Sequence, residues 1–164
     1  MARYRVTGMD EYIRQLEDLA GNADGYIGKA VYEGAGLVAD AIRANIQGLS
    51  AVEDGVGAHA YRAGTYAPLT ESAKAGLLEG FGISELRAEN GYYHVKLGFD
   101  GYNRLRTRRF PKGQPNVLIA RTFERGNSFT ARRPFIKPAL QATRTQCEET
   151  MNRVLNDEIE KLMK

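Results

Sequence analysis

Apolar residues recur at helical spacing in the first half of the chain. The first run predicts a short helix that ends at Gly21-Asn22. Its apolar positions are Met9, Tyr12, Ile13, Leu16 and Leu19. A second, longer helix is predicted from about 24 to 47, because its apolar residues step by three or four positions in one continuous stripe. Gly34 and Gly36 lie inside this helix at a cost of ~1 kcal/mol each relative to alanine. Either tertiary packing overrides that cost, or the two glycines let another backbone come close.

The second half of the chain contains one more long apolar stripe, which predicts a helix from about 136 to 162. Pro138 lies in its first turn, where backbone amides lack partners within the helix, so the regular helix should begin near Phe135 or Ile136. Pro134 favours extended geometry in the residue before it. We therefore expect a stiff elbow that turns Phe135 inward, with Phe135 and Leu140 holding the helix against a sheet.

The stretch "ISELRAENGYYHVKLGF", residues 83–99, predicts a β-hairpin. Asn90-Gly91 favours a type I′ turn, because both central residues of that turn need a positive φ. The pairs expected across the strands are Ala88 with Tyr93, Leu86 with Val95, Ser84 with Leu97, Arg87 with His94, and Glu85 with Lys96. A lone hairpin is marginally stable in water, so further strands are expected. "ARYRVTG" at the N-terminus is one candidate, and residues 117–124 fit either a strand or a helix.

Two segments rich in glycine and proline separate these elements, at 48–69 and 100–116. Long connections of this kind are uncommon in compact domains and are usually functional or mobile. A further helix is predicted to begin at Thr70 and to end at Gly80 or Gly82. The pattern as a whole predicts a single α+β domain over residues 1–164, in which a small antiparallel sheet is packed by two long helices.

The distribution of charge says more than the net charge of +3. Residues 1–103 carry 9 basic and 14 acidic side chains, whereas residues 104–144 carry 11 basic and one acidic. Such a basic region suits nucleic acid or an acidic protein surface, including that of an identical subunit. The chain lacks an apolar run long enough to cross a membrane and an apolar leader at its start. With a single cysteine it cannot form an internal disulfide, and we expect an intracellular protein.

The residues offer little for catalysis. His59 and His94 are isolated from other potential ligands, so we expect neither a metal site nor a cofactor. Cys147 lies on the apolar stripe of a predicted helix, where cysteine is usually a small core residue. "GVGAHAYRAG" lacks the preceding strand and following helix of a phosphate-binding loop. We therefore expect no enzyme activity.

The segment "ARTFERGNSFTARRPFIKPAL" resembles the pattern of the tail-completion, or head–tail joining, proteins of long-tailed bacteriophages and prophages. The family pattern has an aromatic-Glu-x-Gly stretch, then a Pro-Phe-aliphatic-basic-Pro-Ala-Leu elbow and a terminal helix. The matching positions are Phe123, Glu124, Gly126, Pro134, Phe135, Ile136, Lys137, Pro138, Ala139 and Leu140. "VTGMDEYIRQLEDL" and "VYEGAGLVADAIRANI" are similar to the family's opening and to its second helix. The loops 48–69 and 100–116 depart from the pattern, which leaves neck adaptor, tail terminator and tail-tube plug as alternative roles.

The resemblance implies a small α+β domain that assembles into a ring, expected to be sixfold, between the head connector or adaptor proteins and the tail-tube proteins. The protein would then act in the virion neck or tail, after assembly in the host cytoplasm. DNA passes through such a ring, so basic residues of one loop would line it and touch phosphates without reading sequence. These residues are Arg104, Arg106, Arg108, Arg109 and Lys112. Charge alone suggests Arg132 or Arg133 as the partner of Glu124.

One alternative is a free nucleic-acid-binding module that uses the basic loop 104–112. An enzyme of unrecognised type is a third and weaker alternative.

Overall fold

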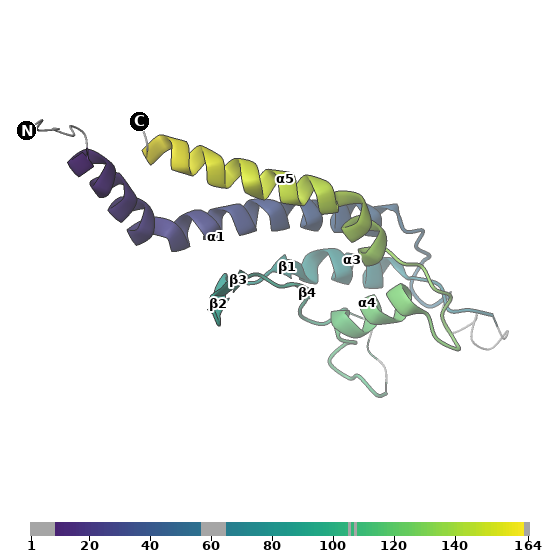
Figure 1. The fold of residues 1–164 in the computed structure, drawn as a ribbon. Coiled ribbons are helices and arrows are strands. Elements are labelled where there is room, and N and C mark those ends of the chain that lie inside the picture. Colours follow the sequence, from purple (N-terminus) through teal and green to yellow (C-terminus); the bar gives the residue numbers. More distant parts are fainter. Residues whose placement is uncertain (1–8, 57–64, 105, 107, 163–164) are drawn as a thin grey trace, which may run out of the picture.

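The computed structural model describes residues 9–56, 65–104, 106 and 108–162, and these form an α+β fold (Figure 1). Within these ranges there are four helices and two small antiparallel sheets. In chain order they are α1 (Met9–Gly48), α3 (Glu71–Gly80), β1 (Phe81–Ile83), β2 (Arg87–Glu89), β3 (Tyr92–His94), β4 (Leu97–Phe99), α4 (Asn116–Arg125) and α5 (Ile136–Leu162). The candidate strand "ARYRVTG" and His59 lie outside the described residues. None of the described helices is long and apolar enough to cross a bilayer.

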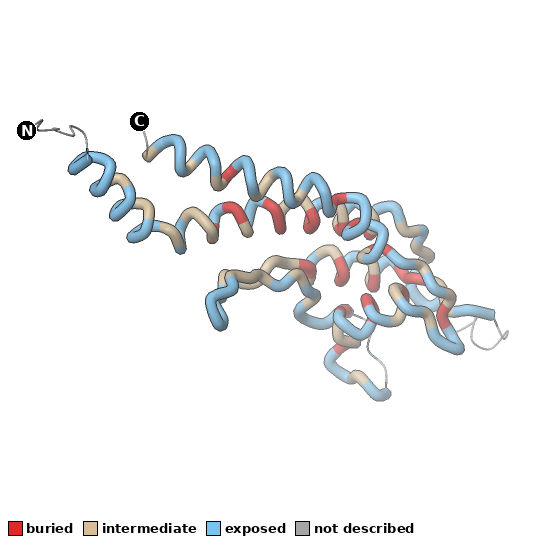
Figure 2. The backbone as a smooth tube through the Cα atoms, in the orientation of Figure 1, coloured by how far each residue is buried: buried red, intermediate tan, exposed pale blue. Residues whose placement is uncertain are grey.

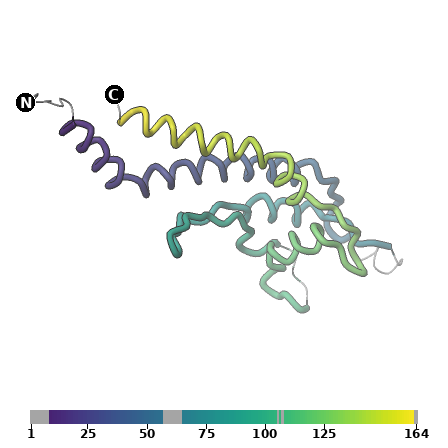
Figure 3. Tube along the Cα trace, viewed as in Figure 1, coloured from purple at the N-terminus to yellow at the C-terminus, as the bar shows by residue number. Residues whose placement is uncertain are grey.

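Helices α1 and α5 form an antiparallel pair along one side of the molecule, with α3, α4 and the strands on the other side of α1 (Figure 1). The predicted break at Gly21-Asn22 is wrong, because α1 is a single helix of 40 residues that continues through these two positions. The Asn22 side chain donates a hydrogen bond to the carbonyl of Asp18 and so supports the helix instead of ending it. The trace in Figure 3 shows that α1 changes direction near this point. Isolated glycines weaken a helix by only ~1 kcal/mol each, which is too little to end one that is anchored further along.

The close approach of α5 to α1 occurs at Gly34. A Cβ at this position would lie 2.5 Å from Met151 Cε and 3.0 Å from Cys147 Sγ, both on α5. The neighbours are side chains and not the backbone that the sequence suggested, and no atom lies within 4 Å of a Cβ built at Gly36. Of these two glycines, Gly34 therefore has a packing reason to be glycine and Gly36 has none.

The hairpin forms, but in two separate ladders. Asn90 and Gly91 have φ values of 53° and 80°, which confirms the predicted turn. The pairs nearest the turn are also confirmed, because β2 and β3 place Arg87 opposite His94. Further out the predicted register is wrong by one residue, since Leu97 faces Ile83 in the β1–β4 pair.

The register shifts because residues 84–86 on one strand face only residues 95–96 on the other, as in a β-bulge. Two of the backbone groups freed there bond to Tyr32 of α1. Its hydroxyl accepts a hydrogen bond from the Leu86 amide at 2.8 Å and donates one to the Ser84 carbonyl at 3.2 Å. The Tyr93 hydroxyl donates to the Asp24 carboxylate, a second contact with α1.

The segment after α1 is fastened to the start of α3. Val52 forms a parallel bridge with Thr70, and the Asp54 carboxylate accepts hydrogen bonds from both the amide and the hydroxyl of Ser72. The helix predicted to begin at Thr70 is α3, and Thr70 is its N-cap, with its hydroxyl accepting a hydrogen bond from the Ala73 amide. Residues 57–64 lie outside the described part of the chain.

Residues 117–124, left open by the sequence, belong to the helix α4. The buried residues of α4 follow helical spacing and leave the opposite face to solvent. Figure 2 shows that buried positions gather where α1, α3, α4 and the start of α5 meet, whereas the first third of α1 is exposed. The core there is formed by Val38, Ala39, Ile42, Ile46, Leu69, Ala73, Leu77, Phe81, Ile119, Ala120, Phe123, Phe135 and Ala139.

Candidate functional site

The segment from Phe123 to Leu140 forms a closed joint between α4 and α5. Helix α4 ends at Gly126, whose φ of 74° favours glycine. A Cβ at Gly126 would also lie 3.1 Å from the backbone nitrogen of Arg132, so the returning chain passes close by. Asn127 and Thr130 bond to each other through their backbones, and the Arg133 amide donates to the Phe123 carbonyl at 2.7 Å. The chain therefore reverses direction within a few residues before α5 begins.

Glu124 holds the start of α5 across this joint. Its carboxylate accepts hydrogen bonds from the backbone amides of Phe135, Ile136 and Lys137 at 2.8, 2.9 and 3.0 Å. The amides at a helix N-terminus have no partners within the helix and carry partial positive charge, so an anion is favourable there. Burial acts to raise the pKa of Glu124, but these three hydrogen bonds, helped by Arg132, hold its pKa below the ordinary value. The predicted arginine partner is thus a minor contributor, and the expected ion pair is replaced by a helix cap.

Phe135 ties the same joint to the rest of the core. Its side chain is fully buried and meets the Phe99 ring of β4 edge-on, with 6.0 Å between the ring centres. Its carbonyl accepts a hydrogen bond from the Asn45 side chain of α1 at 2.9 Å. The predicted inward orientation of Phe135 and the start of α5 at Ile136 are confirmed. Pro138 lies in the first turn of α5, where its lack of an amide proton does no harm.

The remaining pattern residues divide between core and surface. Phe123 and Ala139 are buried, whereas Pro134 and Pro138 are exposed. The prediction that Leu140 holds α5 on the sheet is wrong, since Leu140 is 47% exposed. Helical geometry explains this: Ala139 and Thr143, four residues apart, take the inner face of α5, and Leu140 follows Ala139 by one position.

The basic loop stands away from the core on a fixed base. At that base the Asn103 amide donates to the Gln114 carbonyl at 3.0 Å, and the Gln114 amide donates to the Asn103 side chain at 2.9 Å. Within the loop, the Arg109 guanidinium lies over the Phe110 ring, with 5.7 Å between Arg109 Cζ and the ring centre. All five predicted cations are exposed, and within the described part of the chain none pairs with a carboxylate: Arg104, Arg106, Arg108, Arg109 and Lys112.

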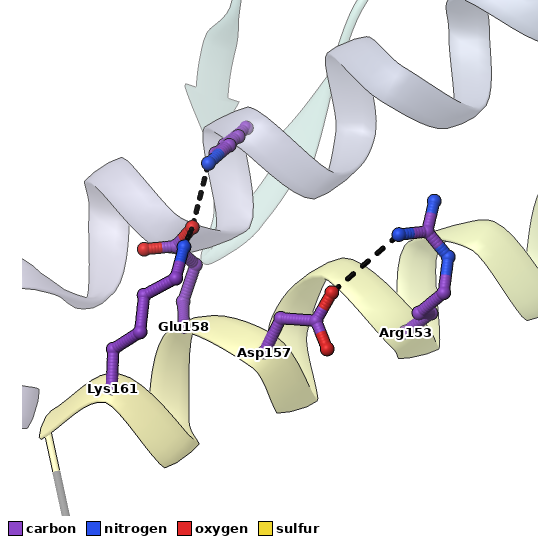
Figure 4. A network of polar contacts seen from close by, with 5 residues as sticks. Arg153, Asp157, Glu158 and Lys161 are labelled. Carbon is purple, nitrogen blue, oxygen red and sulfur yellow. Dashed lines mark hydrogen bonds and ion pairs between the residues drawn. The ribbon is translucent and has the colours of Figure 1, made fainter. Parts of the chain in front are cut away.

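A separate group of charges joins the far end of α5 to α1 (Figure 4). Glu158 accepts a hydrogen bond from Lys29 of α1 at 2.6 Å and from Lys161 at 2.8 Å, and Arg153 pairs with Asp157 at 3.5 Å. The hydrogen bonds from Lys161 and then Lys29 hold the pKa of Glu158 below its usual range. The pair of Lys29 with Glu158 crosses between the helices and so helps to fasten α5 to α1, whereas the other two pairs lie within α5.

The described residues offer little machinery for catalysis. Among them, no three His, Cys, Asp or Glu side chains lie close enough together to hold a metal ion. Cys147 packs against Gly34, and burial, with a smaller effect from Glu148, raises the pKa of its thiol. A thiol with a raised pKa is a poor nucleophile near neutral pH.

The sequence indicated the joint and the basic loop, and missed Asn45, which connects the joint to α1, and Tyr32, which connects the hairpin to α1. Tyr32 and Asn45 act on backbone groups 52 to 90 positions away in the chain, so local sequence carries no signal for them. We find no match for this chain among models of protein families, curated proteins or solved structures.

Proposed function

We propose that this protein is a non-enzymatic structural component of phage assembly that forms a ring, a hexamer by analogy, at the head–tail junction or the tail end. The observation that carries the proposal is the joint between α4 and α5. The residues that resemble the family pattern form one physical unit, in which the Glu124 carboxylate holds the amides of Phe135, Ile136 and Lys137. The pattern residues between Phe123 and Ala139 that are buried or hydrogen-bonded in this joint therefore have a structural reason to be present.

The uneven charge supports assembly with copies of the same chain. Helix α1 carries seven acidic and three basic side chains, whereas residues 100–135 carry nine basic and two acidic. Subunits of a ring meet through two different patches, so opposite charges on separate parts of one chain favour that geometry. In this proposal the ring contacts head connector or adaptor proteins on one side and tail-tube proteins on the other, and the basic loop faces packaged DNA without reading its sequence.

Electron microscopy and native mass spectrometry of the purified protein test the proposal. We expect closed rings at high protein concentration, and particles assembled without the protein should show heads and tails that fail to join. The proposal fails if the protein stays monomeric at all concentrations and head–tail joining proceeds normally in its absence.

A second candidate function, nucleic-acid binding by a free module, is favoured by the exposed basic loop on its fixed base. Replacing Arg104, Arg106, Arg108 and Arg109 with serine should then weaken DNA binding and reduce the slope of log K against log salt by about one for each phosphate that is no longer neutralised. A matched control removes the same number of exposed arginines elsewhere: Arg14, Arg87, Arg144 and Arg153. If the wild-type protein shows no DNA binding at low salt, or if both variants lose binding equally, the loop is not a DNA-binding site.

A further inference from the structure

The first third of α1 presents an apolar stripe to solvent. Met9, Tyr12, Ile13 and Leu16 are 51%, 48%, 45% and 43% exposed. Their spacing of three, one and three places them on one face of the helix. Asp10 and Glu17 each follow a member of this stripe by one position, and so border it on one side. This "α1 stripe" (Met9, Tyr12, Ile13 and Leu16) therefore has the composition of a contact surface, with an apolar centre and an acidic border along one side.

A second exposed apolar surface lies on the outer side of α4. Val117 and Leu118 are 53% and 36% exposed, and Arg121 and Arg125 continue the same side of the helix. The basic loop leads directly into α4. We call the four residues Val117, Leu118, Arg121 and Arg125 the "α4 face". Glu124, the one acid of α4, directs its carboxylate to the amides of α5, so the face itself presents two arginines and no acidic side chain.

The two surfaces are complementary and lie far apart. Residues 9–22 carry four acidic side chains and one basic, whereas the α4 face and the basic loop together carry seven basic side chains. Figures 1 and 3 place the start of α1 at one end of the molecule and α4 toward the other, so a chain cannot bring its own two surfaces together. Two complementary patches at separate places on one chain match head-to-tail association of identical subunits.

We propose that the α1 stripe of one copy docks on the α4 face and the basic loop of the next copy. The apolar residues of the two helices would form the centre of the contact, with Asp10 and Glu17 against the arginines of α4. This inference rests on the proposed ring, for which it names the subunit interface, and it commits to a second copy of this chain as the occupant of both surfaces.

Single-cysteine cross-linking tests the contact directly. In a Cys147→Ser background, one variant carries Ile13→Cys and another carries Leu118→Cys. With a short bismaleimide, a mixture of the two should give a covalent dimer, and neither variant alone should give one. A mixture of Leu118→Cys with Glu149→Cys, an exposed position on the outer side of α5, is the control and should stay uncross-linked. Dimers from Ile13→Cys alone would show that the stripe pairs with itself, and would overturn the proposal.

Charge reversal provides an independent test in the full chain. Asp10→Lys with Glu17→Lys, or Arg121→Glu with Arg125→Glu, should weaken self-association about tenfold, and the combination of all four should restore most of it. A merely misfolded variant would not be rescued by further substitutions. If the wild-type protein forms rings but the four substitutions do not restore association and the mixture does not cross-link, this interface is wrong and the ring proposal stands. If the wild-type protein never self-associates, and head–tail joining is normal without the protein, both the interface and the ring proposal are wrong.

Discussion

Replacement of Glu124 tests the physical basis of the joint. The Glu124→Ala variant leaves three amides at the start of α5 without their acceptor, and Glu124→Gln keeps the shape but removes the charge. Glutamine also turns an NH₂ group toward amides that can only donate. Both variants should therefore destabilise the protein, and alanine should do so more strongly.

The size of the loss follows from where the three amides lie. Phe135 is fully buried, so its amide cannot turn to water and an unsatisfied group of this kind costs ~1–3 kcal/mol. Lys137 is exposed and Ile136 half-buried, so water replaces much of what their amides lose. Removal of an anion from a helix N-terminus adds ~0.3–1 kcal/mol. We expect a decrease in the free energy of unfolding of about 2–4 kcal/mol for alanine and about 1–2 kcal/mol for glutamine.

Urea denaturation at pH 7, monitored by circular dichroism, measures these differences in the free energy of unfolding. Glu149→Ala is the matched control, because Glu149 is an exposed glutamate within α5, and it should change the free energy of unfolding by less than ~0.5 kcal/mol. The pH dependence gives a second check. The pKa of Glu124 is lower in the folded than in the unfolded chain, where it is near 4.5, so its stabilisation is fully present above that value. The stabilisation is lost as the pH falls through the pKa of Glu124 in the folded protein. The difference in the free energy of unfolding between wild type and Glu124→Gln should therefore become smaller in that pH range.

The reasoning is refuted if Glu124→Gln unfolds at the wild-type urea concentration, or if the gap between the two proteins is the same at pH 3 as at pH 7. Either result would mean that the carboxylate does not hold the start of α5 in solution.

Three contacts that join α1 to the rest of the fold are tested by substitutions at Gly34, Tyr32 and Glu158, with Gly36→Ala as a comparison for Gly34. Gly34→Val should lower the free energy of unfolding by roughly 1–3 kcal/mol, because Met151 must move. Gly36→Ala should instead raise the free energy of unfolding by about 0.5–1 kcal/mol. Equal effects of the two substitutions in urea denaturation would contradict this packing. Tyr32→Phe removes the hydroxyl that bridges the hairpin, and should cost about 0.5–1.5 kcal/mol and speed hydrogen exchange at the Leu86 amide; unchanged exchange would exclude that role. Glu158→Gln should lower the melting temperature slightly at low salt and hardly at all in 1 M salt, since exposed cations hold this carboxylate; a loss that does not depend on salt would point to packing instead.

The candidate site was predictable where its signals are local. The proline spacing located the start of α5, and the isolated run of basic residues located the exposed loop. The role of Glu124 was not predictable, because the acceptor and the amides that it caps are 11 to 13 residues apart and meet only after the chain reverses at Gly126. Charge suggested an arginine as its partner, whereas three amides at one helix end offer better geometry than a flexible side chain.

By itself the sequence determined the elements that depend on near neighbours: the long helical stripes, the Asn90-Gly91 turn with its nearest pairs, the helix start at Thr70 and the inward Phe135. Only the tertiary structure decided the rest. Helix α1 is anchored by packing from Gly28 onward and continues through Gly21-Asn22 as one helix, Tyr32 stabilises a one-residue offset in the hairpin, and the inner face of α5 falls on Ala139 and not on Leu140. Each of these depends on a contact between residues distant in the chain, whose free energy exceeds the small local preference that it overrides.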